Sequence, residues 1–147
     1  MLRPGELSSE TVHATAVAIG GRAILIAGRS GAGKSDLALR LIDRGAVLVS
    51  DDQTMVIRRD GRLIASPPVT LAGRMEVRGI GIVEMPHVTD IEVALVVTVD
   101  GTPERLPLTA SERRLAGVTV PMVALAALEP SAPVKVEMAL KRLGTAT

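Results

Sequence analysis

Residues 24–42 read ILIA-GRSGAGKS-DLALRLI: an apolar run, a glycine-rich octet, and a segment with leucines at helical spacing. The octet, residues 28–35, fits the pattern G-x-x-x-x-G-K-[ST]. The apolar run before it predicts a buried strand, and Leu37, Leu41 and Ile42 behind it predict the apolar face of a helix. Strand, glycine loop and helix in this order are what a phosphate-binding loop (P-loop) requires, so we predict an α/β fold around it.

Each residue type in the octet has a reason to be there if the loop binds phosphate. Glycines let backbone N–H groups turn inward and approach phosphate oxygens, and the helix N-terminus adds partial positive charge. Lys34 is expected to reach the β and γ phosphates, and the Ser35 hydroxyl to ligate Mg²⁺. The alternative is a turn that only caps the helix. The predicted nucleotide-binding residues are Gly28, Arg29, Ser30, Gly31, Ala32, Gly33, Lys34 and Ser35.

Two consecutive carboxylates follow the next apolar run, AVLVS at residues 46–50. A P-loop enzyme needs a carboxylate at the end of a neighbouring buried strand to hold Mg²⁺ directly or through water. Strand alternation is expected to send Asp51 and Asp52 to opposite sides, so that one serves the metal and the other faces the acceptor. The second is a plausible general base for an attacking hydroxyl. The alternative is a strand-ending turn of short polar residues.

The remaining patterns predict a mixed sheet in one domain, residues 11–147, after a tail at residues 1–10. Residues 11–27 predict a hairpin that turns at Gly20-Gly21, and residues 119–128 fit either a strand or a helix. The other predicted elements are a buried strand at 46–50, a two-stranded ribbon at 54–59 and 62–66, strands of the sheet within 74–85 and 91–99, and a helix at 134–144.

Composition excludes several classes of protein. The chain has 147 residues, 47% of them hydrophobic, and no Phe, Trp, Tyr or Cys. Without aromatic residues it lacks the stacking platforms of single-strand and RNA readers, and a net charge of +1 lacks the basic excess typical of duplex DNA binding. Without cysteine it has neither disulfides nor cysteine-ligated zinc. No apolar run has the length of a membrane span, so we expect a cytoplasmic protein without nucleic-acid or membrane partners.

Four stretches together resemble the catalytic domain of the HPr kinase/phosphorylase family, bacterial enzymes that use ATP to phosphorylate a serine of the phosphocarrier protein HPr. They are Val12-His13, the octet, LVSDD at residues 48–52, and MEVRGIGI at residues 75–82, which is similar to the family signature E-I-R-G-L-G-I. The resemblance runs from about Thr11 to Leu143. It implies a P-loop-containing nucleotide-binding fold of the HPr kinase catalytic-domain type, a mixed sheet with a few helices.

The resemblance also implies roles for single residues. His13 matches the active-site histidine, Lys34 the phosphate lysine and Asp52 the catalytic acid/base. Ser35 matches the Mg²⁺ ligand, and Glu76 matches the signature glutamate that contributes to the metal site. With Asp51 from the strand argument, the predicted metal ligands are Ser35, Asp51 and Glu76.

Three of the assigned residues have plainer interpretations. Arg105, in Glu-Arg-Leu-Pro-Leu, matches loosely an active-site arginine in the family segment Asp-Arg-Leu-Gly-Leu, but a solvated loop charge explains it equally well. His13 alone would be a strand histidine with local hydrogen bonds. Glu76 could form a salt bridge with Arg78, although the Gly-x-Gly beside them suggests a close approach to the backbone.

These comparisons lead to a functional hypothesis. We expect an ATP- and Mg²⁺-dependent serine kinase of an HPr-like phosphocarrier, in a short form without the family's N-terminal domain. The family's Pro-Val-Arg-Pro-Gly-Arg-Asn segment, linked to the reverse reaction, aligns with residues 128–133, which have no arginine. That argues against a phosphorylase activity. The alternatives are an ATP-sensing regulatory module and a small-molecule kinase, and the resemblance implies a homo-oligomer, a hexamer.

Overall fold

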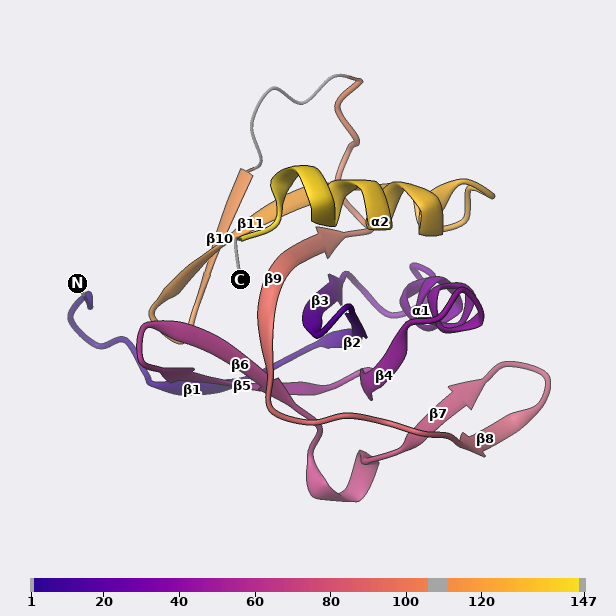
Figure 1. Ribbon diagram of the computed structural model, residues 1–147, viewed down its shortest axis with the longest axis horizontal. Helices are drawn as coiled ribbons and strands as arrows, with labels where there is room; N and C mark the ends of the chain where they lie inside the picture. The colour runs from indigo at the N-terminus through magenta and orange to yellow at the C-terminus, as the bar shows by residue number, and fades with distance from the viewer. Residues whose placement is uncertain (1, 106–110, 146–147) are drawn as a thin grey trace.

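The computed structural model describes residues 2–105 and 111–145. Within these residues, nine strands form one mixed sheet, two strands form a separate hairpin, and two helices complete the fold (Figure 1). The elements, in chain order, are β1 (Ser9–Val12), β2 (Ala14–Ile19), β3 (Arg22–Ala27), α1 (Lys34–Asp43), β4 (Val47–Ser50), β5 (Thr54–Arg59), β6 (Arg62–Ser66), the short 3-10 helix η1 (Val69–Leu71), β7 (Arg74–Val77), β8 (Gly81–Glu84), β9 (Ile91–Thr98), β10 (Ser111–Leu115), β11 (Val118–Ala124) and α2 (Ala132–Leu143).

The long strand β9 organises the sheet. The sheet order is β1-β5-β6-β9-β3-β2-β4, and β11 pairs with both β9 and β10. The first residues of β9 pair antiparallel with β6, whereas its last residues pair in parallel with β11 (Figure 1). On its other side β9 runs parallel to β3, with Ala27 opposite Thr98. The carboxyl ends of β3 and β9 therefore lie side by side, and the loop after β3 starts there.

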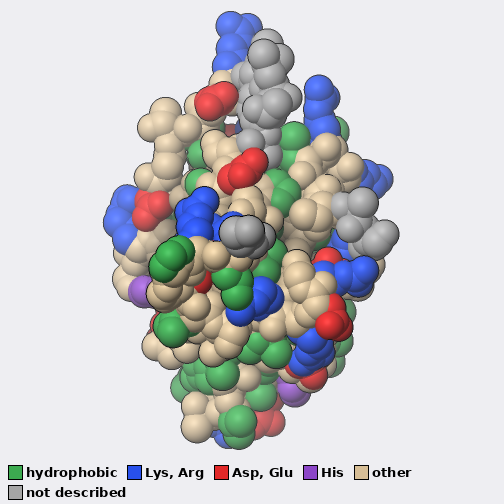
Figure 2. All heavy atoms as spheres, turned by 90° about the vertical axis from the view of Figure 1, so that its left-hand side faces the viewer, with side chains coloured by type: hydrophobic (Ala, Val, Ile, Leu, Met, Phe, Trp, Pro, Cys, Tyr) green, Lys and Arg blue, Asp and Glu red, His purple; other side chains and the backbone are tan. Residues whose placement is uncertain are grey.

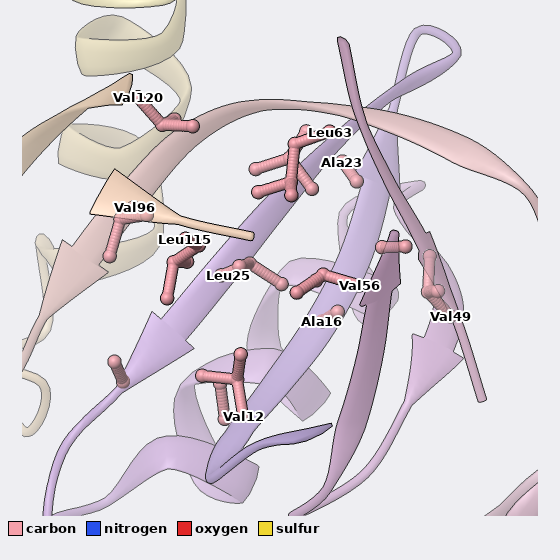
Figure 3. Close-up of a cluster of buried hydrophobic side chains, with 14 of the residues drawn as sticks. Val12, Ala16, Ala23, Leu25, Val49, Val56, Leu63, Val96, Leu115 and Val120 are labelled. Carbon is pink, nitrogen blue, oxygen red and sulfur yellow. The ribbon is translucent and has the colours of Figure 1, made fainter. Parts of the chain in front are cut away.

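Two hydrophobic cores cover the two faces of this sheet, because strand residues alternate between faces. In β3, Ile24 and Ile26 face α1 and α2, whereas Leu25 faces a core made by the strands of the curled sheet. Figure 3 shows this second core, where Leu25 lies among Val12, Val56 and other aliphatic side chains from distant strands. Small aliphatic residues, several of them alanines, fill both cores.

The helix after the P-loop depends on one of these cores. Leu41 of α1 is completely buried. We expect Leu41→Ala to lower the free energy of unfolding by about 2–5 kcal/mol, because it removes buried methyl groups and leaves a cavity. Urea unfolding measures the change. Leu7→Ala is the matched control, since Leu7 is 69% exposed and its truncation should cost little. Equal losses for the two variants would contradict the assignment of Leu41 to the core.

The structure confirms most of the predicted elements, corrects the placement of one segment, resolves one that was left open, and shows that the first strand begins earlier and that one strand was not predicted. Residues 74–77 and 81–84 form a hairpin of their own rather than two strands of the main sheet (Figure 1). The ambiguous segment at 119–128 is a strand as far as Ala124, because it pairs with both β9 and β10. Strand β10 had no sequence signal, and β1 begins at Ser9, inside the predicted tail.

The N-terminal segment is held on the sheet by an ion pair and a hydrogen bond to the backbone. Both carboxylate oxygens of Glu6 accept hydrogen bonds from Arg114, at 2.7 Å from Nε and 2.9 Å from Nη2. Glu10 Oε2 accepts from the backbone N–H of Ala116 at 2.7 Å. The face of the molecule that carries the N-terminus has acidic and basic side chains interspersed (Figure 2). No helix within the described ranges is long and apolar enough to cross a membrane.

The Glu6 ion pair makes stability depend on pH. The Arg114 side chain, which donates to the Glu6 carboxylate, lowers the pKa of Glu6 to about 2. Because the pKa of Glu6 is lower in the folded chain than in the unfolded chain, where it is about 4.3, the ionised carboxylate stabilises the fold at pH values above 4.3. This contribution is lost as the pH falls through the pKa of the folded state. We expect the melting temperature to fall between about pH 5 and pH 2. Glu6→Gln should make this fall shallower, whereas Glu112→Gln, an exposed control on β10, should leave it unchanged. Identical pH curves for wild type and Glu6→Gln would contradict this.

Candidate active site

The P-loop connects the end of β3 to the start of α1. Helix α1 begins at Lys34, and Gly33 before it has φ 96°, a left-handed conformation that glycine adopts without strain. The Lys34 side chain lies within the loop, where Nζ donates to the carbonyl oxygens of Gly28 at 2.5 Å and Arg29 at 3.1 Å. Lys34 is buried, with 6% of its surface exposed. A buried cation in a glycine loop is suited to binding anions.

Ser35 and Asp51 meet beside the loop, as the strand argument predicted. The Ser35 Oγ donates to Asp51 Oδ1 at 2.7 Å, although the two residues come from α1 and the end of β4. Asp51 is buried, and its Oδ2 accepts from the backbone N–H of Glu76 at 3.1 Å. A hydroxyl and a carboxylate so close together are hard oxygen ligands of the type that Mg²⁺ prefers.

Asp52 and His13 form a second pair, which is open to solvent. His13 Nε2 lies 2.9 Å from Asp52 Oδ1, and the two side chains are 53% and 61% exposed. His13 lies between β1, which pairs with β5, and β2, which pairs with β3 and β4. The structure thus brings together two residues that the sequence singled out separately. An exposed carboxylate oriented by an imidazole can accept a proton from a group that approaches from solvent.

Asp51 and Asp52 point apart, but not because of strand alternation. Strand β4 ends at Ser50, and Asp52 has φ 66°, in the left-handed region that aspartate tolerates better than most residues. The backbone N–H of Gln53 donates to the Asp51 carbonyl at 2.7 Å, which closes a tight turn. Asp51 is buried against Ser35 and Asp52 is exposed beside His13, and the predicted cause, strand alternation, does not apply because both residues follow the end of β4.

Thr15 links the two acidic residues and was missed in the sequence. Its hydroxyl donates to Asp51 Oδ1 at 3.2 Å and accepts from the backbone N–H of Asp52 at 3.0 Å. Thr15 is fully buried in β2, among alanine, valine and isoleucine. A lone hydroxyl in an apolar strand was the available signal, because a buried polar group requires a partner.

The signature segment approaches the site through its backbone. Glu76 contacts Asp51 by its N–H, whereas the Glu76 residue is exposed. Arg78 lies beyond the end of β7. Among the residues that the structure describes, no ion pair joins it to Glu76. The glycines of the signature do not make room for a close neighbour: a Cβ at Gly79 or Gly81 would meet nothing within 4 Å, and both have positive φ. They are needed for the turn between β7 and β8.

Ser35 and Asp51 are too few to hold a metal ion by themselves, but they are suited to Mg²⁺ that is also bound by water and phosphate. No group of three or more His, Cys, Asp or Glu side chains that could hold a metal occurs in the part of the chain that the structure describes. Mg²⁺ usually keeps several waters and takes one or two protein ligands together with substrate phosphates. Ser35 and Asp51 meet that requirement, and a ligand role for the Glu76 side chain stays a prediction.

Arg105 stands apart from this cluster, whereas residues 127–129 border the P-loop. Arg105 is exposed in the segment after β9, and the structure gives it no hydrogen bond or ion pair with the P-loop residues it describes. Its proposed role stays a prediction. Residues 127–129 lie against the P-loop helix, because Arg40 donates to the carbonyls of Ala127 and Glu129. A Cβ on Gly33 would lie 3.0 Å from Leu128 Cδ2, so this segment borders the loop.

The sequence is similar to proteins of one known family. The sequence profile described as HPr Serine kinase C-terminal domain matches residues 6–139. The chain is 43% identical over 91 residues to an HPr kinase/phosphorylase from Clostridium tetani, which covers 61% of this chain and 30% of that protein. An HPr kinase/phosphorylase from Levilactobacillus brevis is 32% identical over 129 residues, 79% of this chain and 42% of the other.

A solved structure extends the likeness to three dimensions. The HPr(Ser) kinase/phosphatase from Coxiella burnetii superposes with a TM-score of 0.78 at 30% identity, over 90% of this chain and 95% of that one. The mixed sheet and few helices described above are thus those of an HPr kinase catalytic domain. The chain belongs to the HPr serine kinase C-terminal domain family. It spans less than a third of the length of the Clostridium tetani relative.

Proposed function

We propose that this chain is a serine kinase that transfers the γ-phosphoryl group of ATP, with Mg²⁺, to an HPr-like phosphocarrier in the cytoplasm. The observation that carries the proposal is the adjacency of two pairs with different exposure. Ser35 and Asp51 are 2.7 Å apart beside the buried Lys34, and His13 and Asp52 are 2.9 Å apart at the surface. The first pair suits a nucleotide and its metal, and the second suits a hydroxyl presented by another protein.

Each group of the site has one role in the proposed phosphoryl transfer. P-loop N–H groups and Lys34 Nζ bind the phosphates, for which Lys34 exchanges its carbonyl partners for phosphate oxygens. Bound Mg²⁺, held by Ser35 and Asp51, would neutralise charge on the phosphates. The acceptor serine oxygen forms a bond to the γ-phosphorus, the bond from that phosphorus to the leaving oxygen of ADP breaks, and Asp52 takes the serine proton. His13 orients the Asp52 carboxylate, and catalysis rests on positioning and charge neutralisation.

Two parts of the proposal extend beyond this geometry. The segment at residues 128–133 has no arginine, which supports a kinase without phosphorylase activity. A homo-oligomer is proposed from the family resemblance, and exposed Ile80 and Ile82 on the β7–β8 hairpin supply apolar surface for it. Light scattering that gave the monomer mass of 15.3 kDa at all micromolar concentrations would contradict the oligomer.

The test is direct phosphorylation. The purified chain is incubated with Mg²⁺-ATP and an HPr-type carrier, and the intact mass of the carrier is measured. We expect the gain of one phosphoryl group that survives mild acid, as phosphoserine does and phosphohistidine does not. A carrier in which the acceptor serine is replaced by alanine should gain nothing. ATP binding without transfer would favour the sensor hypothesis, and turnover with small metabolites alone would favour a small-molecule kinase; either result overturns the proposal.

A further inference from the structure

Asp100 is a carboxylate at the P-loop that neither the motif nor the family signature identifies. It lies just beyond the end of β9, the strand that runs parallel to β3. Its Oδ2 accepts a hydrogen bond from the backbone N–H of Arg29 at 2.8 Å, and its Oδ1 accepts one from Thr98 Oγ1 at 3.1 Å. The carboxylate therefore joins the end of one parallel strand to the loop that follows the other.

The first two residues of the P-loop are in close contact with this end of β9. A Cβ on Gly28 would lie 2.8 Å from Val99 Cγ2 and 3.5 Å from Asp100 Oδ2, so a larger residue does not fit there without displacing β9. The backbone N–H of Val99 donates to the Ala27 carbonyl at 2.9 Å, which continues the pairing of the two strands. The loop thus leaves the sheet along a surface made by Val99 and Asp100.

Arg29 is held on both sides of its backbone. Its N–H donates to Asp100, and its carbonyl accepts from Lys34 Nζ at 3.1 Å and from the backbone N–H of Ala32 at 3.2 Å. When Lys34 turns to phosphate it leaves the Arg29 carbonyl, and the Asp100 contact remains. Asp100 is then the side chain that continues to fix the first turn of the loop.

We propose that Asp100 is a positioning residue that presets the first turn of the P-loop for the phosphates of the nucleotide. The inference rests on the proposed nucleotide binding and adds a residue to it. A loop already fixed in its binding shape loses less conformational entropy when the ligand binds. Asp100 acts through the Arg29 peptide and touches neither substrate.

Asp100 can act on nucleotide binding in two ways, through its negative charge and through its hydrogen bond to the loop, and substitutions can separate the two. Hydrogen bonds from Arg29 N–H and the Thr98 hydroxyl lower the pKa of the Asp100 carboxyl, so it is ionised at neutral pH. A carboxylate near a phosphate site repels the ligand, whereas a hydrogen-bond acceptor orders the loop. Asparagine keeps an acceptor oxygen and removes the charge. If positioning dominates, Asp100→Asn retains binding and Asp100→Ala loses it.

The test measures Mg²⁺-ADP binding to the full chain by titration calorimetry. We expect Asp100→Ala to raise Kd about tenfold, as loss of the hydrogen bond that orders the loop implies. Asp100→Asn should stay within about threefold of wild type. Thr98→Val, which removes only the hydroxyl that orients the carboxylate, should fall between them. Glu137→Ala is the matched control, because Glu137, on α2, accepts two hydrogen bonds from Arg44, which follows the C-terminal end of α1 and lies away from the loop.

Kinetics separate positioning from a general loss of structure. With a carrier as acceptor, Asp100→Ala should raise KM for ATP about tenfold and leave kcat at saturating ATP and KM for the carrier unchanged. Unfolding midpoints are measured for every variant; if Asp100→Ala does not fold, Asp100→Asn and Thr98→Val decide. Wild-type protein that binds no nucleotide refutes the proposed function. Wild-type binding matched by Asp100→Ala, or Asp100→Asn as weak as Asp100→Ala, refutes the positioning role alone.

Discussion

Asp52→Asn is expected to lower kcat for carrier phosphorylation by about 10²–10⁴-fold, the usual contribution of a positioned general base. Asparagine keeps the size of aspartate and also tolerates the left-handed backbone, φ 66°, of this position. What it loses is the carboxylate that we propose takes the serine proton, and that lies 2.9 Å from His13 Nε2. KM for ATP should change little, because the phosphates are bound by the P-loop. Initial rates at saturating ATP and carrier measure the effect.

The chain offers a close control for this variant. Asp60, in the turn between β5 and β6, is also exposed and left-handed, with φ 52°. Asp60→Asn should therefore reproduce any general effect of the substitution on folding and leave kcat unchanged. If Asp52→Asn turns over at the wild-type rate, Asp52 is not the base and the proposed mechanism fails at that step.

Lys34→Met should have the other large effect, on both binding and transfer. Methionine keeps the length and apolar stem of lysine, which is buried in the loop, and removes the ammonium group. Loss of charge-assisted hydrogen bonds should raise Kd for Mg²⁺-ATP about ten- to hundredfold. Loss of charge stabilisation during transfer should lower kcat about 10²–10³-fold. Calorimetry and initial rates measure the two separately.

The control for Lys34→Met is Lys141→Met, an exposed lysine in the last turn of α2. It removes one positive charge and leaves the P-loop intact, so binding should match wild type. Unfolding midpoints are needed for both, since Lys34 Nζ also joins the carbonyls of Gly28 and Arg29. A Lys34→Met protein that is folded and binds Mg²⁺-ATP as wild type does would refute the assignment of the P-loop.

The parts of the site that the sequence predicted are local in the chain. The octet places Lys34 and Ser35 by its own geometry, and an apolar run followed by two aspartates marks the end of a strand. The contact between Ser35 and Asp51 was expected because one general rule for P-loop enzymes brings those two elements together. The role of His13 rested on family resemblance, since one histidine in a strand has many possible roles, and its contact with Asp52 was not predicted.

The parts that could not be predicted depend on which strands become neighbours. Thr15 reaches Asp51 because β2 lies beside β4, and Asp100 reaches Arg29 because β9 lies beside β3. Neither neighbour is adjacent in sequence to its partner. The segment that forms β7 and β8 was predicted to belong to the main sheet, because alternation of apolar and polar residues indicates a strand but does not indicate which strand it pairs with. The turn at Asp52 is different, because it is closed by a local hydrogen bond and a strand-ending turn was the alternative interpretation of the two aspartates.

The position of β3 between two cores has a consequence for how the molecule opens. Ile24 and Ile26 are buried on one face and Leu25 on the other, and the strand pairs on both edges. Segments with this degree of burial open only with the whole domain, whereas exposed turns fluctuate locally. Amide protons of β3 and β9 should therefore exchange slowest with deuterium, and those around Asp52 much faster. The proposed phosphate-binding loop then follows a strand that is buried on both faces, while the exposed turn at Asp52, where we propose that the acceptor approaches, keeps the freedom to adjust to it.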